Sequence, residues 1–315
     1  MTILVTGAGG FIGGHLVSKL LNQGQDVRAV DIKPVNQWDQ VFQVENIVAD
    51  LRDKSECYHV CNHMTRVYNL AANVGGIKFI KSHKAECMQN VLINTHLLQA
   101  ARDKNVEKYF FASSACVYDL DKQQADDSAP LKEEDAYPAN PENGYGWEKL
   151  FSERMCINFA EDYGLQARVA RLHNVYGTHC IWRGGREKAP AELCRKVALA
   201  GNNPIEIWGD GRQIRSYMWV DDTLEAIDRL MCKDINEPIN IGSTEAVTVN
   251  ELVSIIEEVA GVQCEKTYAP SEPTGVRVRN CDDSKAESVL EWKPSTTLKE
   301  GISKLYPWIE SQIQS

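Results

Sequence analysis

The 315-residue chain has no long apolar run and no charged leader at its start. A membrane-spanning helix needs about 20 consecutive apolar residues, and no apolar stretch of this sequence approaches that length. Residues 1–6 have the pattern of a strand, whereas a secretory signal begins with positive charge followed by an apolar segment. We therefore expect no membrane partner and no secretion.

Positive charge is also scarce. The chain has 34 Lys and Arg against 44 Asp and Glu, which gives a formal net charge of −10. An acidic protein repels the phosphates of nucleic acids and the surface of anionic membranes. We therefore expect no nucleic-acid partner, although local Arg and Lys residues could still bind a small anionic ligand.

The ten cysteines lack the regular spacing of a disulfide framework. In a chain without a leader, scattered cysteines indicate reduced thiols and a cytoplasmic location. Cys57, His59, Cys61 and His63 suggest a metal site at first, but a closed zinc site needs a second, distant pair of ligands. A partly buried helix is the favoured interpretation, and we expect no metal.

Short apolar segments alternate with helical patterns through the first half of the chain. Helices are expected at 11–21, 88–104 and 146–162, and strands at 3–6, 26–31, 46–50, 66–72, 108–115 and 167–173. Strands that alternate with helices form a parallel sheet covered on both faces. The sequence therefore predicts an α/β fold with a doubly wound parallel sheet.

The pattern changes after residue 174, where loops rich in Gly, Arg and Pro interrupt it. We predict a large domain of residues 1–174 plus about 208–242. We predict a smaller α/β lobe of residues 175–207 and 243–315, which would bind the substrate. The polar stretch 119–141 contains three prolines and is expected to be a long surface loop.

A glycine-rich turn joins the first strand to the first helix. Gly7, Gly10 and Gly13 form a Gly-x-x-Gly-x-x-Gly pattern, and Phe11 and Ile12 lie within it. Glycines here permit a tight turn, close approach of a pyrophosphate to the helix N-terminus, and close helix–strand packing. The alternative is a structural turn without a ligand, but the strand–turn–helix context favours a Rossmann-type dinucleotide site.

Acidic residues follow the second and third strands. Asp31 comes eighteen residues after Gly13, and its carboxylate can accept hydrogen bonds from both ribose hydroxyls of NAD. The same charge would repel the extra phosphate of NADP, so we predict NAD as the cofactor. Asp50 and Leu51 are placed to meet the adenine, with an ordinary strand-end Asp as the alternative.

Tyr145 and Lys149 lie four residues apart at the start of a predicted helix, so both face the same side. A nearby ammonium and a positive nicotinamide ring stabilise a phenolate, which would allow Tyr145 to act as a base near neutral pH. Lys149 can also bind the ribose. Ser114 ends the fifth strand and could donate to the same substrate oxygen.

The glycine turn, the strand-end Ser and the helical Tyr-x-x-x-Lys together resemble the extended short-chain dehydrogenase/reductase family, over nearly the whole chain. Further runs are similar to those of the GDP-mannose 3,5-epimerases within that family: residues 70–76, 112–116, 171–177, 184–190, 208–211, 215–216 and 275–280. The loop 119–136 departs from the pattern, beginning at Asp119. The related 4,6-dehydratases have an Asp-Glu pair where this chain has Ala115 and Cys116, which disfavours dehydration.

This resemblance implies an isomerase that inverts C3 and C5 of a nucleotide sugar through a transient 4-keto intermediate. GDP-mannose is the expected substrate, with GDP-L-galactose or GDP-L-gulose as the product. The resemblance assigns proton transfer at carbon to Cys116 and Lys188, and oxidation at C4 to Tyr145, Lys149 and the non-consumed NAD. We expect the positive end of the following helix, with Arg183 and Arg186, to lower the pKa of Lys188.

The same resemblance, with the chemistry of the side chains, indicates the sugar-nucleotide site and the assembly. Arg215 and Arg279 are candidates for the diphosphate, because guanidinium groups match phosphate oxygens. The other expected substrate contacts are Gly75, Gly76, Ser114, Asn174 and Lys188. The family also implies a homodimer formed through the helices at 88–104 and 146–162.

Two alternatives remain open from the sequence. The first is a nucleotide-sugar 4-epimerase or 4-keto-sugar reductase, which needs neither Cys116 nor Lys188. The second is a regulator that senses NAD without catalysis, which predicts erosion of Tyr145 or Lys149, and both are intact.

Overall fold

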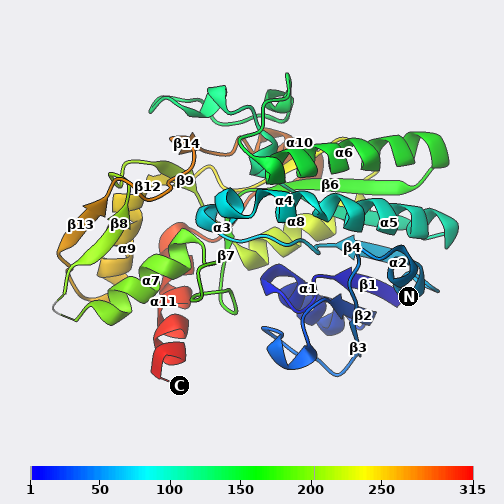
Figure 1. Cartoon of the computed structure of the whole chain (residues 1–315), viewed down its shortest axis with the longest axis horizontal. Helices are drawn as coiled ribbons and strands as arrows, with labels where there is room; N and C mark the ends of the chain where they lie inside the picture. The colour runs from blue at the N-terminus through cyan, green and yellow to red at the C-terminus, as the bar shows by residue number, and fades with distance from the viewer. Residues whose placement is uncertain (1, 202, 315) are drawn as a thin grey trace.

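The computed structural model describes residues 2–201 and 203–314. Its centre is a parallel sheet of seven strands in the order β11-β6-β5-β4-β1-β2-β3 (Figure 1). The strands are β1 (Thr2–Thr6), β2 (Asp26–Asp31), β3 (Glu45–Val48), β4 (Arg66–Asn69), β5 (Lys108–Ser114), β6 (Gln166–Leu172) and β11 (Ile239–Ile241). This confirms the predicted doubly wound α/β fold.

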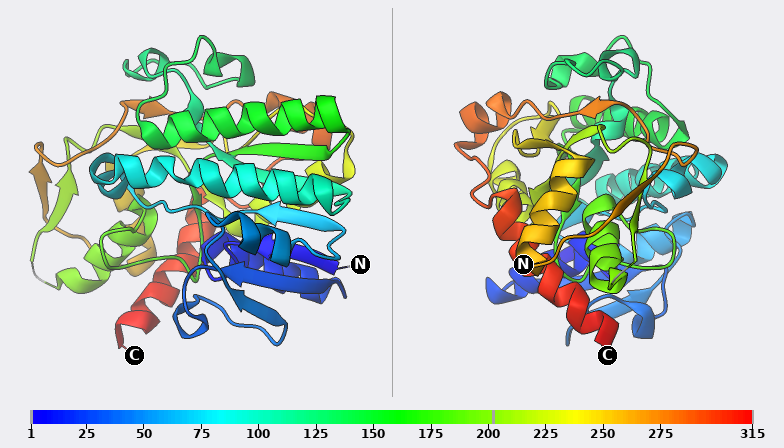
Figure 2. Two further views of the ribbon diagram at one scale, coloured as in Figure 1. Left: turned by 45° about the vertical axis from the view of Figure 1, so that its right-hand side comes forward. Right: turned by 90° about the vertical axis from the view of Figure 1, so that its left-hand side faces the viewer.

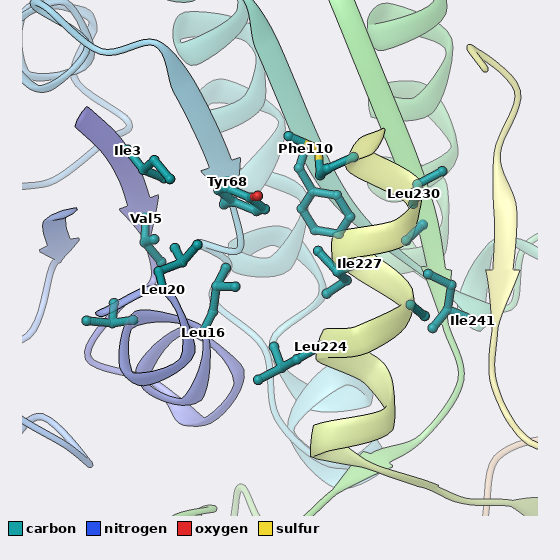
Figure 3. Close-up of a cluster of buried hydrophobic side chains, with 14 of the residues drawn as sticks. Ile3, Val5, Leu16, Leu20, Tyr68, Phe110, Leu224, Ile227, Leu230 and Ile241 are labelled. Carbon is teal, nitrogen blue, oxygen red and sulfur yellow. The ribbon is translucent and has the colours of Figure 1, made fainter. Parts of the chain in front are cut away.

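Side-chain alternation on the strands explains the two layers of helices. On β1, Ile3 and Val5 belong to one hydrophobic core and Leu4 to the other, as the two-residue period of a strand requires. The first core is completed by α1 (Phe11–Asn22), α8 (Val220–Cys232) and α10 (Ser284–Leu290). Figure 3 shows Leu16 and Leu20 of α1 in this core together with Leu224, Ile227 and Leu230 of α8.

The opposite face of the sheet is covered by α2 (Lys54–Val60), α5 (Asn90–Asp103) and α6 (Gly144–Tyr163). Local sequence sets both ends of α6: the Asn143 side chain accepts from Gly146 N, and Gly164 ends the helix with a φ of 70°. The helix predicted at 88–104 is confirmed as α5 to within two residues at each end, and the short helix α4 (Lys84–Met88) precedes it.

A second lobe packs at the carboxyl ends of the strands (Figures 1 and 2). Its core lies among α7 (Ala189–Ala200), α9 (Val249–Ala260) and α11 (Leu298–Gln314). Its strands pair as β13 (Lys266–Ala269) with β8 (Ile205–Trp208), and as β12 (Ala246–Thr248) with β9 (Ile214–Ser216) and β14 (Val278–Arg279). The short strands β7 (Val175–Tyr176) and β10 (Met218–Trp219) pair with each other.

The predicted domain bounds stay a prediction. The first core contains Ala286, Leu290 and Trp292, although these residues fall within the predicted lobe. Conversely, β9 pairs with β12 and β14, although its residues fall within 208–242. The chain therefore crosses between the two parts more often than the irregular pattern after residue 174 suggested.

The loop between β5 and α6 includes the short 3-10 segments η2 (Ala115–Val117), η3 (Asp121–Gln123) and η4 (Glu133–Ala136). The sequence predicted a surface loop here, but Gln123, Leu131 and Ala136 are buried. Leu131 N donates to the Asn280 carbonyl at 3.0 Å, so this loop is attached to the segment after β14. Within the described residues, the helices are all too short or too polar to cross a membrane.

Candidate active site

A cavity of about 440 Å³ lies between the carboxyl ends of the central strands and the second lobe. Many of the residues that the sequence predicted for catalysis and substrate binding line it together. They are Gly75, Gly76, Ser114, Cys116, Tyr145, Asn174, Lys188, Arg215 and Arg279. Residues from seven separate stretches of the chain therefore meet around one space large enough for a small-molecule ligand.

The glycine turn between β1 and α1 has the geometry of a phosphate-binding loop. A Cβ atom added to Gly13 would lie 2.1 Å from the Gly7 carbonyl oxygen, so this position requires glycine. Gly7 itself has a φ of 69°. Gly10 caps α1 without any side-chain hydrogen bond, which leaves the first N–H groups of Phe11 and Ile12 available to an anion.

Asp31 lies beside this turn at the end of β2. One carboxylate oxygen accepts from Gly9 N at 3.1 Å, and the other accepts from Lys33 N at 2.9 Å. Each oxygen has a second lone pair for a ligand. Lys33 Nζ donates to the Gly9 carbonyl at 2.7 Å, so Asp31 and Lys33 also hold the turn in shape.

Asp50 and Leu51 follow β3. The Asp50 carboxylate binds the Arg52 guanidinium, with Nη2 at 2.5 Å from Oδ2, and this hydrogen bond lowers the pKa of Asp50. Leu51 is buried, and its carbonyl accepts a hydrogen bond from the Cys57 thiol. The predicted contact of Asp50 and Leu51 with adenine stays a prediction.

Tyr145 and Lys149 lie one turn apart on α6, and both side chains are buried. Lys149 Nζ lies 4.6 Å from the centre of the Phe111 ring and 5.6 Å from that of Tyr145. Burial raises the pKa of Tyr145 well above its usual value, while a hydrogen bond with Ser114 acts in the opposite direction. A bound positive charge beside the ring would be needed to make Tyr145 an effective base near neutral pH.

Ser114 and Cys116 lie where β5 ends. The Ser114 hydroxyl accepts from Cys116 N at 3.2 Å and caps η2. This turn directs the half-buried Cys116 into the cavity. Gly146 approaches from α6, and a Cβ atom added there would lie 2.2 Å from the Cys116 carbonyl oxygen, so α6 and the thiol-bearing turn are in direct contact.

Lys188 is the N-cap residue of α7 and lines the same cavity. The pKa of its amine is lowered, as expected, but the main cause is desolvation and not the neighbouring arginines. Lys188 is an exposed residue that lines the cavity, yet the protein atoms packed around its amine displace enough water to disfavour the charged form. The Cys116 thiol interacts electrostatically with this amine, so both groups act on the same space.

The two arginines expected to act on Lys188 point elsewhere. Arg183 stacks on Trp182, with its Cζ atom 4.8 Å from the ring centre. The Arg186 guanidinium lies 3.9 Å above the Phe79 ring and donates to Asn73 Oδ1 at 2.9 Å. Arg186 therefore docks the loop before Lys188 onto the first domain.

Arg215 and Asn174 have polar partners within the protein. The Nη atoms of Arg215 donate to the carbonyls of Ile214, Thr274, Val276 and Arg277 at 2.6 to 3.3 Å. Desolvation is the first cause that lowers the pKa of Arg215, to about 10, and Arg279 adds to it. Asn174 donates to the Ser216 carbonyl at 3.0 Å. Contact of these two residues with substrate stays a prediction.

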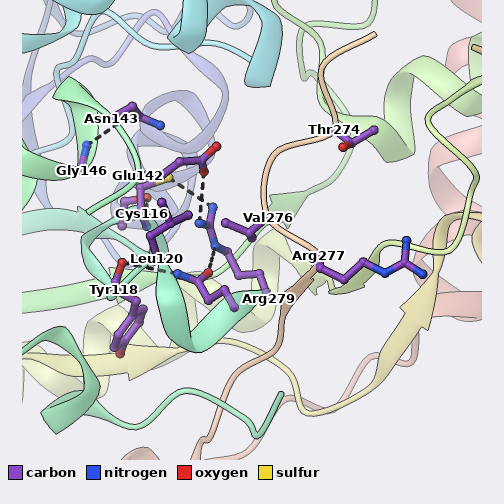
Figure 4. Close-up of polar contacts among 12 residues, drawn as sticks. Cys116, Tyr118, Leu120, Glu142, Asn143, Gly146, Thr274, Val276, Arg277 and Arg279 are labelled. Atoms are coloured by element: carbon purple, nitrogen blue, oxygen red, sulfur yellow. Dashed lines mark hydrogen bonds and ion pairs between the residues drawn. The ribbon is translucent and has the colours of Figure 1, made fainter. Parts of the chain in front are cut away.

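Arg279 lies against the proposed acid–base thiol. Its Nη1 atom is 3.5 Å from Cys116 Sγ, and its Nη2 atom is 3.6 Å from Glu142 Oε2. Figure 4 shows the Arg279 guanidinium beside Cys116 and Glu142, whereas Arg277 points away from them. Sequence reasoning missed Glu142 and Gln123, the second partner of Arg279, because neither lies in a recognisable motif.

Comparisons with known proteins agree with this geometry. A model of the NAD dependent epimerase/dehydratase family matches residues 3–242. GDP-mannose 3,5-epimerase 1 of Oryza sativa subsp. indica is 42% identical over 316 residues, which cover 100% of this chain and 83% of the rice protein.

Two solved structures show the same architecture. The UDP-glucose 4-epimerase of Thermotoga maritima, crystallised with UDP-glucose, has a TM-score of 0.90 and 28% identity, covering 99% of this chain and 100% of that one. MoeE5 in complex with UDP-glucose and NAD has a TM-score of 0.84 and 31% identity, with 99% and 100% coverage.

Proposed function

Because the chain belongs to the NAD dependent epimerase/dehydratase family, we propose that it inverts C3 and C5 of GDP-mannose. Its general activity is that of an NAD-dependent nucleotide-sugar epimerase, an isomerase that regenerates its cofactor. The choice of GDP-mannose and of both carbons is the finer part of the proposal. The expected products are GDP-L-galactose and GDP-L-gulose.

One observation supports this choice most directly: Cys116 and Lys188 line the same cavity as Tyr145. Oxidation at C4 requires a single base, and Tyr145 is suited to it. Exchange of protons on carbon requires a further acid and a further base. A thiol from the first domain and an amine from the second lobe supply that additional pair.

The cofactor site fits NAD. The uncapped start of α1 offers N–H groups to the pyrophosphate, and Asp31 keeps lone pairs for the adenosine ribose. Bound NAD⁺ would supply a reversible hydride acceptor and a positive ring. Such a charge close to Tyr145 would offset the effect of burial on the phenol.

The side chains then have separate tasks. Tyr145 removes the proton of the C4 hydroxyl, with Ser114 as its hydrogen-bond partner. A carbonyl at C4 acidifies the hydrogens on C3 and C5. One member of the Cys116/Lys188 pair removes such a proton, which leaves the electron pair as an enolate, and the other returns a proton to the opposite face. The lowered pKa of Lys188 suits it to either step.

A 4-epimerase is the competing activity, because the Thermotoga maritima enzyme with that name has the same fold. That reaction inverts only C4 and has no task for Cys116 or Lys188. The rice 3,5-epimerase is also more similar in sequence, at 42% against 28%. We therefore favour inversion at C3 and C5.

The test is incubation of the purified protein with GDP-mannose in D₂O, followed by NMR of the recovered sugar. The proposal predicts deuterium at C3 and C5 and new sugar stereoisomers. Recovery of GDP-mannose without deuterium, together with inversion of C4 in a UDP-sugar, would establish the 4-epimerase instead.

We also propose a homodimer formed through α5 and α6, which lie side by side (Figure 2). Trp147 and Phe151 are one turn apart on α6 and are 46% and 56% exposed, and Leu92 of α5 is 41% exposed. Such large apolar side chains on neighbouring helices favour a partner surface. Light scattering should give twice the chain mass, and Phe151→Glu should give monomers. A monomeric wild-type protein at micromolar concentration would refute the dimer.

The proposed compartment is the cytoplasm. All ten cysteines are free thiols in the structure, which suits a reducing environment.

A further inference from the structure

The loop that joins η2 to α6 sends one fully buried polar side chain to the active site. Gln123, at the end of η3, is 0% exposed. Its Nε2 atom donates to the carbonyls of Tyr118 at 3.3 Å and Asp119 at 2.9 Å. Its Oε1 atom accepts from Arg279 Nε at 2.8 Å. The amide is therefore held by its own loop and presents its acceptor to Arg279.

This contact determines the orientation of the whole guanidinium. Because the guanidinium is planar and rigid, fixing Nε also fixes the directions of both Nη atoms. Nη1 then lies 3.5 Å from Cys116 Sγ, and Nη2 lies 3.6 Å from Glu142 Oε2. Each nitrogen of the guanidinium therefore has its own partner: Gln123 at Nε, Cys116 at Nη1 and Glu142 at Nη2.

The loop is also fixed to the chain immediately beyond Arg279. Leu131 N donates to the Asn280 carbonyl at 3.0 Å, and Asp282 N donates to the Leu131 carbonyl at 3.1 Å. These bonds prevent the loop and the segment after β14 from shifting independently. The position of Gln123 relative to Arg279 is therefore fixed at two points.

We propose that Gln123 is a positioning residue for proton transfer at carbon, because it holds the Arg279 guanidinium on the Cys116 thiol. A permanent cation at the sulfur stabilises negative charge there through a charge-assisted hydrogen bond. When the sulfur removes a proton from the sugar, the C–H bond breaks, an S–H bond forms and the electron pair stays on the sugar as the enolate. The inference rests on the proposed function, which assigns this step to Cys116.

The experiment compares Gln123→Leu with Gln124→Leu in the full-length protein. Gln124 is the exposed neighbour, and its amide donates only to the Leu120 carbonyl. Deuterium incorporation at C3 and C5 of GDP-mannose measures the carbon step, and transient NADH absorbance measures the hydride step. A third readout is the rate at which iodoacetamide alkylates Cys116 without substrate, located by mass spectrometry, with the exposed Cys232 as the reference thiol.

We expect Gln123→Leu to slow deuterium incorporation by about 10- to 100-fold, the factor that losing one hydrogen bond to a charged group typically costs. NADH formation should stay within about threefold of wild type, because oxidation at C4 uses Tyr145 as its base and not the Cys116 thiol. Alkylation of Cys116 should slow, because the thiolate is the reactive form. A loosened loop would instead expose Cys116 and speed its alkylation, so the direction of change separates positioning from loss of structure.

The proposal is overturned if Gln123→Leu incorporates deuterium at the wild-type rate, alkylates faster, or loses NADH formation in the same proportion. If Gln123→Leu does not fold, Gln123→Asn and Gln124→Asn give the same comparison, because Asn keeps the amide but withdraws the acceptor from Arg279. A wild-type protein that incorporates no deuterium would refute the proposed function, and the alkylation rates would then decide the position of Arg279 on their own.

Discussion

The backbone of Gly76 lies directly against the carbonyl of Glu187: a Cβ atom added to Gly76 would lie 2.4 Å from that oxygen. In addition, Gly76 N donates to the Arg186 carbonyl at 3.1 Å. The two residues before Lys188 therefore rest on the first domain through backbone contacts. This explains how an amine from the second lobe is placed in the same cavity as the Cys116 thiol.

Gly76→Ala should displace the loop that precedes Lys188, because the new methyl group cannot approach the Glu187 carbonyl so closely. We expect deuterium incorporation into GDP-mannose to fall by about 10-fold or more, since misplacing a catalytic group by about 1 Å is enough for such a loss. NAD binding should not change. Gly24→Ala is the control, because a Cβ atom added to Gly24 would meet no atom within 4 Å and the backbone there has a φ of 71°. This variant should lower the stability of the protein without changing deuterium incorporation.

Arg186→Met should have a similar effect, because it removes both the stacking on Phe79 and the hydrogen bond to Asn73. The expected outcome is slower deuterium incorporation with normal transient NADH absorbance. Arg183→Met, in the same loop, removes only the stacking on Trp182 and should behave like wild type. Equal rates for the two variants would show that the Arg186 contact does not position Lys188.

Asp31→Asn should weaken NAD binding and reduce the preference for NAD over NADP. Its amide keeps the shape of the carboxylate beside Gly9 N and Lys33 N, but it lacks the charge that repels a 2′-phosphate. Titration calorimetry with both dinucleotides gives the ratio. If the wild-type protein binds NADP as tightly as NAD, the role assigned to Asp31 is wrong.

His173 should make the fold sensitive to acid. It is fully buried, and desolvation is the main cause that lowers its pKa from 6.5 to about 4. The unfolded chain therefore binds the extra proton first as the pH falls. This contribution to stability is complete above pH 6.5 and disappears as the pH approaches 4. Between these limits the free energy of unfolding of the wild type should fall by about 2–3 kcal/mol more than that of a variant with a non-titrating residue at this position.

Urea unfolding of the wild type and of His173→Gln between pH 7.5 and 4.5 measures this difference. Both proteins contain the same carboxylates, so the difference in pH dependence isolates the histidine. Parallel curves for the two proteins would show that His173 takes up its proton without unfolding.

The sequence predicts the central sheet well because its strands are short apolar runs that are buried on both faces of the sheet, as in β1 and β6. The strand β2 has the predicted bounds, and α6 begins near Tyr145 as expected. The helix predicted at 88–104 matches α5, whereas the short helix α4 before it was not predicted. The partial burial of the loop 119–136 was also missed, because its prolines and charged residues are typical of surface loops.

The predicted site residues converge because motifs at the ends of parallel strands meet at one edge of the sheet. What motifs cannot give is the direction of each side chain. Arg279 was expected to bind the diphosphate, which stays a prediction, and its contacts with Cys116 and with Gln123, which is 156 residues away in the sequence, could not be predicted. The desolvation of Lys188 likewise results from packing around the whole cavity.

The most direct test of the proposed epimerisation compares Cys116→Ser and Lys188→Met with Tyr145→Phe in D₂O. Serine keeps the size of the thiol but holds its proton far more firmly, and Met keeps the length of Lys without an amine. We predict that Cys116→Ser and Lys188→Met still give transient NADH absorbance with GDP-mannose but lose deuterium incorporation at C3 and C5 by about 10²–10⁴-fold. Tyr145→Phe should suppress both signals. Wild-type deuterium incorporation in both Cys116→Ser and Lys188→Met would contradict the account and leave a 4-epimerase or a 4-keto-sugar reductase as the better description.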